Sequence, residues 1–157
     1  MTFEITEGAS NDAIRKHIRD LDRKIARGIR QGFFKVGSLL KTTAREQMME
    51  KPKHGRLYRI RRGSQMRTHI ASAYSETPAN VTGALRKSIG FEPSGMILVF
   101  GAGGRDSGVD YAAYLEDGTD KMLPRPLLRN AVHKQQGAIM PMMQEAVGHE
   151  INLIQGK

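Results

Sequence analysis

Four carboxylates form the cluster in this chain whose residue types and spacing come closest to metal chemistry. They are Asp110, Glu116, Asp117 and Asp120. Paired carboxylates can hold Mg²⁺ and so support hydrolysis of a phosphodiester. Glu116 and Asp117 are adjacent, however, and adjacent side chains point apart on a helix, while Asp110 is placed to N-cap that helix. A helix terminus is therefore the favoured interpretation, and a Mg-dependent nuclease the minor one.

Other familiar catalytic patterns are incomplete in this sequence. Gly101-Ala102-Gly103 follows a strand-like run, as in a dinucleotide-binding fingerprint, but the third glycine of that fingerprint would fall at Asp106. The five histidines are scattered without a pair at zinc-ligand spacing, and there is no GxSxG elbow. The absence of cysteine excludes disulfides and thiolate chemistry. We therefore predict no catalytic residues, no metal site and no cofactor.

The most distinctive segment is basic rather than catalytic. Between Lys51 and His69 there is no acidic residue, and short apolar runs lie on either side of Gly63-Ser64. This pattern predicts a β-hairpin arm with too few apolar residues for a core of its own. We expect its basic residues to contact a nucleic acid or an acidic protein surface. They are Lys51, Lys53, Arg56, Arg59, Arg61, Arg62 and Arg67.

The net charge of +9 belongs to the first half of the chain. Residues 1–75 carry a surplus of +10, whereas residues 76–157 carry a balance of −1. Such asymmetry indicates a nucleic-acid backbone or an acidic protein surface as partner. A solvated basic face that aids solubility would give the same balance, and charge alone does not separate these readings.

The helices that must position this arm are long. Residues 2–6 alternate as a short strand, and Ser10 or Asn11 can N-cap a helix that runs to about Glu50. An arginine-rich face opposes its apolar stripe, which comprises Ile14, Ile18, Leu21, Ile25, Ile29, Phe33, Val36 and Leu40. Glycines at 28, 32 and 37 predict a bend or two helices, although the first two could also admit a second helix at close range.

Shorter elements follow the arm. Thr82 is expected to cap a short helix, Phe91 to begin a strand, and residues 93–95 to form the turn before a strand at 96–100. A mobile loop at 101–108 and a short helix at 111–116 precede a last helix from Leu128 to Ile154, which Pro141 should kink or restart. These elements predict an α+β fold: a small antiparallel sheet flanked by N- and C-terminal helices.

We expect one domain over residues 1–157, with residues 51–80 as an extended arm and loop. Only 39% of the residues are hydrophobic and 6% are aromatic, so the core should be lean and completed by other subunits. No apolar run reaches the roughly 20 residues of a membrane span, which predicts a soluble protein that is not exported.

Two blocks of the sequence form a recognisable pattern. The first block contains Gly55-Arg56-Leu57-Tyr58, HIASAYSE at 69–76, Pro78-Ala79 and TGALRKSI at 82–89. The second contains YAAYLE at 111–116, Gly118-Thr119, Lys121-Met122 and RPLLR at 125–129. In their order and spacing the two blocks resemble tailed-bacteriophage tail-component and head–tail joining proteins of the siphophage type. The chain departs from that family at Tyr74-Ser75, where a Pro-Gly turn is lost, and at Val81, which replaces a capping Asp.

The resemblance implies a structural virion protein without enzymatic activity at the neck of the particle. Such proteins form homo-oligomeric rings of six or twelve copies around the DNA channel, between the capsid connector or stopper and the tail-tube or tail-terminator proteins. It implies a location in the virion after synthesis in the host cytoplasm, with no membrane partner. A subunit interface or structural joint would then use Tyr111, Tyr114, Glu116, Arg125 and Arg129.

Three alternatives stay open at this point. The protein could be a tail terminator or a minor tail protein, or, in another class, a cellular nucleic-acid-binding protein or a Mg-dependent nuclease. The arm or the arginine face of the first helix could line the DNA channel. The tyrosines and the Arg125-Pro126 corner could also merely pack the sheet against the last helix.

Overall fold

A computed structural model describes residues 7–104 and 107–152, and within them the chain forms four helices and two antiparallel hairpins. In chain order the elements are α1 (Glu7–Gln47), β1 (Leu57–Arg62), β2 (Gln65–Ile70), α2 (Ala84–Ser88), β3 (Gly90–Ser94), β4 (Ile97–Gly101), α3 (Ala112–Asp117) and α4 (Leu128–Asn152). The predicted α+β fold, with long helices near both ends and small antiparallel sheets, is confirmed.

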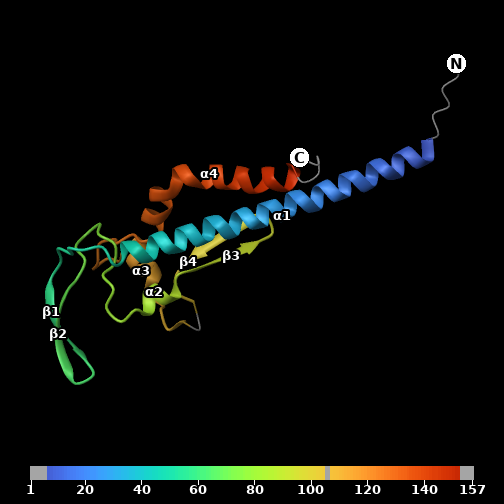
Figure 1. Ribbon diagram of the computed structural model, residues 1–157. Coiled ribbons are helices and arrows are strands. Elements are labelled where there is room, and N and C mark those ends of the chain that lie inside the picture. Colours follow the sequence, from blue (N-terminus) through green and yellow to red (C-terminus); the bar gives the residue numbers. More distant parts are fainter. Residues whose placement is uncertain (1–6, 105–106, 153–157) are drawn as a thin grey trace, which may run out of the picture.

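Helix α1 is the central layer of the molecule. It lies between α4 on one side and the β3–β4 hairpin on the other (Figure 1). Its glycines make this close packing possible: a Cβ atom on Gly28 would lie 2.8 Å from Val147 Cα, and one on Gly32 would lie 2.6 Å from Met143 Sδ. Gly37 in turn faces the ring of Phe91.

The predicted break in this helix is wrong. The glycines cost about 1 kcal/mol each in helix propensity, but the packing of neighbouring elements onto them offsets that cost, so α1 is continuous over 41 residues. The alternative expectation, a second helix admitted by Gly28 and Gly32, describes the structure.

The N-terminal part of α1 projects beyond the rest of the molecule (Figure 1). The side chains of residues 11–20 are all exposed, and Ile14 and Ile18 are 53% and 52% exposed. The predicted N-cap at Ser10 or Asn11 is wrong, because both residues lie inside a helix that already includes Glu7. The predicted strand at residues 2–6 and the last predicted helical position, Ile154, lie outside the described residues.

Helix α4 contains Pro141 and bends rather than restarts (Figure 1). The proline has no N–H to donate to the carbonyl of Gly137, four residues earlier, which allows the helix to turn toward α1. Farther along, the buried Glu150 accepts a hydrogen bond of 2.9 Å from Gln31 Nε2, and Arg27 Nη1 lies 3.8 Å from its other oxygen. A polar contact therefore fixes the end of α4 against α1.

The β3–β4 hairpin differs slightly from its predicted bounds. Ser94 pairs with Ile97, so the turn consists of Gly95 and Met96, and Gly95 has the positive φ of 57° that such a turn favours. Pro93 and Ser94 belong to the strand. Phe91 pairs with Phe100 on the face turned toward α1, and the ring of Phe91 meets Phe34 edge-on.

Two predicted helix caps are corrected by the structure. Gly83, with φ of 87°, is the N-cap of α2, and the Thr82 hydroxyl accepts a hydrogen bond from the N–H of Ala84 instead of capping the helix in the usual way. Tyr111, not Asp110, is the N-cap of α3. The predicted short helices themselves are present.

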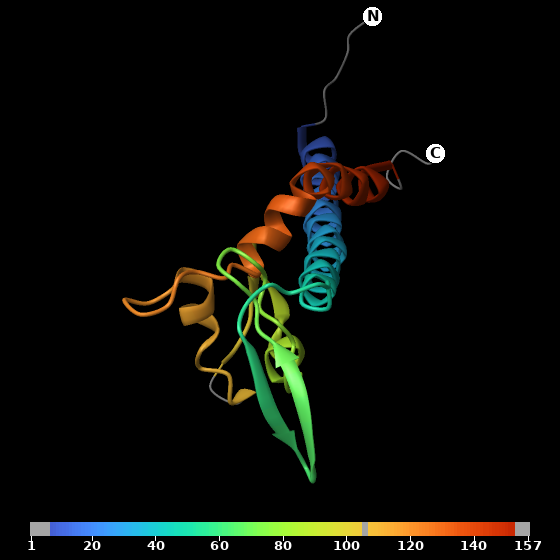
Figure 2. The ribbon, with the colours of Figure 1, turned by 90° about the vertical axis from the view of Figure 1, so that its left-hand side faces the viewer.

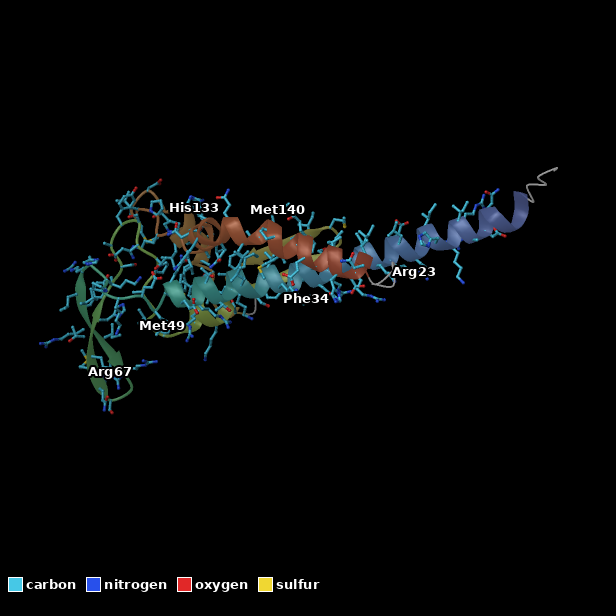
Figure 3. The ribbon with its side chains drawn as sticks, turned by 45° about the horizontal axis from the view of Figure 1, so that its top comes forward. Arg23, Phe34, Met49, Arg67, His133 and Met140 are labelled. Atoms are coloured by element: carbon cyan, nitrogen blue, oxygen red, sulfur yellow. The ribbon has the colours of Figure 1, made fainter. Side chains whose placement is uncertain are left out.

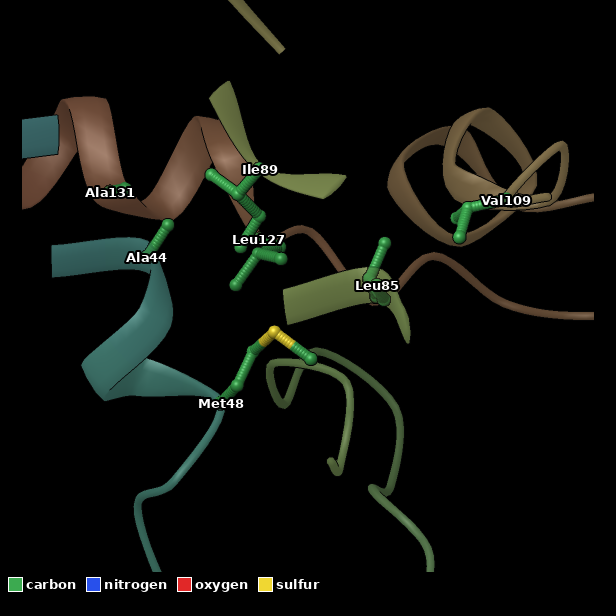
Figure 4. Packing of buried hydrophobic residues seen from close by; sticks show 7 residues of the cluster. All are labelled: Ala44, Met48, Leu85, Ile89, Val109, Leu127 and Ala131. Carbon is green, nitrogen blue, oxygen red and sulfur yellow. The ribbon is translucent and has the colours of Figure 1, made fainter. Parts of the chain in front are cut away.

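The core is small and lies where α1, α2 and α4 meet (Figure 4). Two of its seven residues are alanines, namely Ala44 and Ala131; the others are Met48, Leu85, Ile89, Val109 and Leu127. The accessible surface is 11,700 Å², whereas a compact monomer of this mass exposes about 7,900 Å². The chain thus exposes more surface than a compact monomer does, and large apolar side chains such as Ile14, Ile18 and Leu57 lie on it.

Candidate functional site

The basic arm is a two-stranded hairpin that extends away from the helices (Figure 2). Strands β1 and β2 pair from Leu57↔Ile70 to Arg62↔Gln65, so Gly63 and Ser64 form the predicted two-residue turn. Six residues per strand give a length of about 20 Å. Every side chain of the two strands is exposed except Ile60 and His69, which are half-buried.

The pleat divides the arm into two faces. One face carries Arg59 and Arg61 among exposed apolar side chains, and the other carries Arg62 and Arg67, of which Figure 3 labels the latter. The apolar residues of the first face are Leu57, Met66 and Ile70, between 43% and 61% exposed. Both faces therefore combine cations with apolar surface, which suits contact with phosphate or with protein.

Most of the arm's cations have no acidic partner. Among the described residues, no ion pair involves Lys51 or any of the arginines of the arm. Arg61 and Arg67 make hydrogen bonds only to the neighbouring Gly63 carbonyl and Gln65 amide. The arm therefore presents uncompensated positive charge to solvent.

Lys53 is different from the other predicted contact residues. It is half-buried, and its Nζ donates hydrogen bonds to Thr77 Oγ1 (2.9 Å), to Thr77 O (3.1 Å) and to Gln47 O (3.4 Å). These bonds tie the start of the arm to the end of α1. The structure places this residue in a structural role rather than among the exposed cations.

The base of the arm is fixed by backbone and ring contacts. The N–H of Gly55 bonds to Ala71 O at 2.9 Å and the N–H of Ala71 bonds to Arg56 O at 3.0 Å, which prolongs the ladder toward the body. The rings of Tyr58 and His69 stack with centroids 6.3 Å apart. An isolated two-stranded hairpin is marginally stable, so these contacts at the base hold the arm in place.

Glu76 joins the two segments that enter and leave the arm. Its carboxylate accepts hydrogen bonds from the N–H of Ala73 (2.8 Å) and the N–H of His54 (3.2 Å), and it contacts the His54 ring. The Ala73 bond first, and then the His54 ring, lower the pKa of Glu76 to about 2.

A turn leads to this carboxylate although the sequence has no Pro-Gly pair there. Ser75 adopts a φ of 61°, the left-handed conformation that glycine occupies most easily. The expected loss of a tight turn at Tyr74-Ser75 is therefore wrong. The turn also brings the N–H of Ser75 to 3.3 Å from Pro124 O, next to the second block of the resemblance.

Glu116 is the centre of the joint between α3 and α4. Its oxygens accept hydrogen bonds from the main-chain N–H groups of Leu127 (2.8 Å), Leu128 (3.0 Å) and Arg129 (2.8 Å). The first N–H groups of a helix have no acceptor within the helix itself, and Glu116 supplies one at the start of α4. A negative charge is also favourable at this end of a helix. The side chain of Arg129 returns to Asp117 at 3.0 Å, so both ends of the joint are tied.

The other three residues predicted for an interface lie nearby. The N–H of Arg125 bonds to Leu115 O at 2.7 Å, and its side chain lines a cavity of about 270 Å³ together with Tyr111. Tyr58 and His69 line the same cavity from the arm. Tyr114 is 59% exposed on α3. The cavity thus joins residues of both blocks that carry the resemblance.

The carboxylate cluster considered for magnesium is not assembled. Within residues 7–104 and 107–152, no three histidine or acidic side chains lie together as metal ligands. Glu116 instead points its oxygens at the start of α4. The described helices also include none with the length and hydropathy of a membrane span.

Comparison of the chain with protein-family models, curated proteins and solved structures finds no match.

Sequence reasoning missed three polar anchors of this region. Besides Lys53 and Glu76, Arg45 of α1 donates from Nε to the Arg86 carbonyl at 3.1 Å and from Nη2 to the Ile89 carbonyl at 3.4 Å, which fixes the end of α2. Each of the three also bonds to a residue at least 22 positions away in the chain, and no local pattern reveals that contact. The alternation around Gly63-Ser64 is enough to predict the arm, but only the fold shows which contacts hold it in place.

Proposed function

We propose that this chain is a structural protein of the head–tail junction of a tailed phage, a neck or tail-completion subunit that joins the capsid connector to the tail around the DNA channel. In this role the subunit catalyses no reaction. It acts through its surfaces: the body packs into a ring, and the basic arm reaches a neighbouring ring or the DNA.

One observation carries the proposal. The two sequence blocks that resemble head–tail joining proteins are separated in the chain, yet they meet at the base of the arm. Ser75 of the first block bonds to Pro124 beside the second, and Tyr58 and Tyr111 line one cavity. If the two blocks belong to one structural unit, they should lie in contact in the fold. Their contact therefore supports the resemblance, in addition to their order and spacing in the sequence.

The shape of the subunit also supports an assembly role. A small core, an accessible surface well above that of a compact monomer, and an uncompensated basic arm are typical of a protein that is completed by its neighbours. Repetition of the arm around a ring would concentrate positive charge near the channel axis or against an acidic ring.

Particle assembly tests this function. One variant replaces Leu57–Ile70 with a two-residue turn between the paired residues Arg56 and Ala71, and a matched variant keeps the hairpin but changes Arg59, Arg61, Arg62 and Arg67 to Gln. Both variants should leave filled heads without joined tails when they replace the natural gene. Normal numbers of tailed, infectious particles with the shortened arm would contradict the proposal.

A second function is favoured by the unpaired arginines: non-specific contact between the arm and DNA. Each phosphate contact releases counterions, so the slope of log K against log salt becomes shallower by about 0.9 for each duplex contact removed. Changing Arg59, Arg61 and Arg62 to Gln should flatten that slope, whereas the same change at Arg15, Arg19 and Arg23 of α1 should leave it unchanged. If only the variant at Arg15, Arg19 and Arg23 flattened the slope of log K against log salt, DNA would bind to α1 instead of the arm. If binding did not depend on salt, a protein ring would be favoured as the arm's partner.

A further inference from the structure

The outer face of the β3–β4 hairpin carries exposed apolar side chains, and none of the described residues covers them. Alternation places Phe91 and Phe100 on the face toward α1 and Ile97 and Val99 on the opposite face. Ile97 and Val99 are 66% and 56% exposed, and Met96 at the turn is 72% exposed. An antiparallel sheet that faces water on one side normally carries polar residues there. On this face β3 contributes the polar Glu92 and Ser94, whereas β4 contributes the apolar Ile97 and Val99.

Two glycines flatten the same face at its other end. Gly90 and Gly101 pair with each other and lie on the side of Val99 and Glu92. A Cβ atom on either glycine would meet no atom within 4 Å, so the backbone there is open to an approaching side chain. The face is therefore a shallow apolar surface with a flat end and a single acidic residue, Glu92, opposite Val99.

The projecting part of α1 is a second unpartnered apolar surface. Ile14 and Ile18 are more than half exposed, and Leu21 and Ile25 continue the same stripe in half-buried positions. Because α1 is continuous and its later part packs against the inner face of the hairpin, the projecting part cannot fold back onto the outer face of its own chain (Figure 1). None of the described residues covers Ile14 and Ile18, so this end of the stripe is available to another molecule.

We propose that the stripe Ile14–Ile25 of one copy packs on the outer β3–β4 face of a second copy. The two surfaces are similar in length, since the eleven residue steps from Ile14 to Ile25 rise about 16 Å and the four residue steps of a five-residue strand span about 13 Å. They also match in charge, since arginines such as Arg15 and Arg19 flank the stripe and Glu92 lies on the opposing face. This inference deepens the proposed function, because it supplies the contact between subunits of the ring.

The contact is heterologous: each copy offers a helix to one neighbour and a sheet to the other. Such head-to-tail contacts generate closed rings when the rotation closes and open filaments when it does not. Two single variants can therefore complement each other in a way that a symmetric interface does not allow. Ile18→Glu disrupts the apolar stripe on α1 and leaves the outer β3–β4 face intact. Val99→Glu disrupts the β3–β4 face and leaves the stripe intact.

Sedimentation of the purified chain tests the contact without DNA or other virion proteins. The wild type should show a mass above that of a monomer that grows with concentration, and each variant alone should remain monomeric with unchanged helicity. A mixture of Ile18→Glu and Val99→Glu should form a one-to-one dimer and nothing larger. The intact helix stripe of the Val99→Glu chain packs on the intact sheet face of the Ile18→Glu chain, and the other two surfaces are disrupted. A wild type that stays monomeric at every concentration, or a mixture that does not associate, would overturn the proposal.

Disulfide cross-linking gives a second measurement, because the chain has no cysteine of its own. Mixed Ile18→Cys and Val99→Cys chains should form the mixed cross-link in preference to either self-pair, and a chain with both changes should form a ladder of covalent multimers. Met140→Cys is the control, because Met140 is 62% exposed on α4 and lies outside both proposed surfaces. Its cross-linking yield measures random collisions between chains. Cross-links of Ile18→Cys with itself alone would show helix pairing and overturn the proposal. Either failure would leave the particle-assembly test of the arm unaffected, so the two claims are separable.

Discussion

A Cβ atom on Gly28 would lie 2.8 Å from the Cα atom of Val147, because α4 crosses α1 at this glycine. The neighbour is backbone rather than a flexible side chain, so neither helix can yield without moving the other. A glycine that looks like a weak point in the sequence is thus the contact that sets the distance between the two longest elements.

Gly28→Ala should lower the free energy of unfolding by about 1–2 kcal/mol, as overpacking at this crossing outweighs the gain in helix propensity. Gly148→Ala is the matched control, because a Cβ atom there would meet nothing within 4 Å. That change should raise the free energy of unfolding by roughly 0.5–1 kcal/mol. Urea unfolding of both variants measures the difference, and a stabilising Gly28→Ala would mean that α1 and α4 do not cross there.

Glu116→Ala should lower the free energy of unfolding by about 1–2 kcal/mol, since it removes the acceptor of three N–H groups at the start of α4. Asp117→Asn, one residue away, is the control. Its ion pair with Arg129 is exposed, with side chains 69% and 67% accessible, and should be worth less than about 1 kcal/mol. Equal losses from the two variants, measured by thermal unfolding, would count against the capping role of Glu116.

Ser75→Gly should stabilise the protein by up to about 1 kcal/mol, because glycine adopts the positive φ of 61° without a Cβ clash. Ser75→Val should have the opposite sign, as a β-branched residue tolerates this conformation least. Chemical denaturation of the pair of variants gives both values. If glycine were the less stable of the two, the turn would have a different backbone conformation in solution.

The stabilising effect of Glu76 should disappear in acid. Its folded pKa of about 2 lies below the ordinary value of 4.5, first because of the Ala73 N–H and then because of the His54 ring. The stabilisation is fully present above the unfolded pKa, and it is lost as the pH falls from 4.5 toward 2, where the unfolded chain takes up the proton first.

The measurement is the Tm of wild type and Glu76→Gln across this range. Wild type should unfold at the higher temperature at neutral pH, and the gap should close as the pH drops below 4.5. Glu145→Gln, which removes a carboxylate that is 73% exposed, should show no such convergence. A gap for Glu76→Gln that does not change with pH would show that the carboxylate does not hold the base of the arm.

Local patterns predicted much of this fold and of the arm. The alternation around Gly63-Ser64 and the run at 96–100 identified both hairpins, and the spacing from Ile14 to Leu40 identified α1. These signals depend only on neighbours in the chain. The helix starts near Ser10 and Thr82 were misplaced because a capping residue type does not by itself decide where a helix begins.

Contacts between distant residues could not be predicted in the same way. A glycine in a helix lowers helix propensity whether or not another helix packs on it, so Gly28 gave no sign of Val147. Lys53 carries the same charge as the exposed arginines around it, and only the fold brings Thr77 to its ammonium group. The acid-free run therefore identified the arm correctly but could not separate its structural cation from its free ones.

The presence of the chain in tailed-phage particles is the most direct test of the proposed function. Phage particles produced by cells that carry the gene would be purified and examined for the chain by mass spectrometry and by gold-labelled antibody in electron micrographs. We predict that the chain is a particle component and that the label lies where head meets tail. Purified infectious particles without the chain, or label confined to another part of the virion, would contradict it.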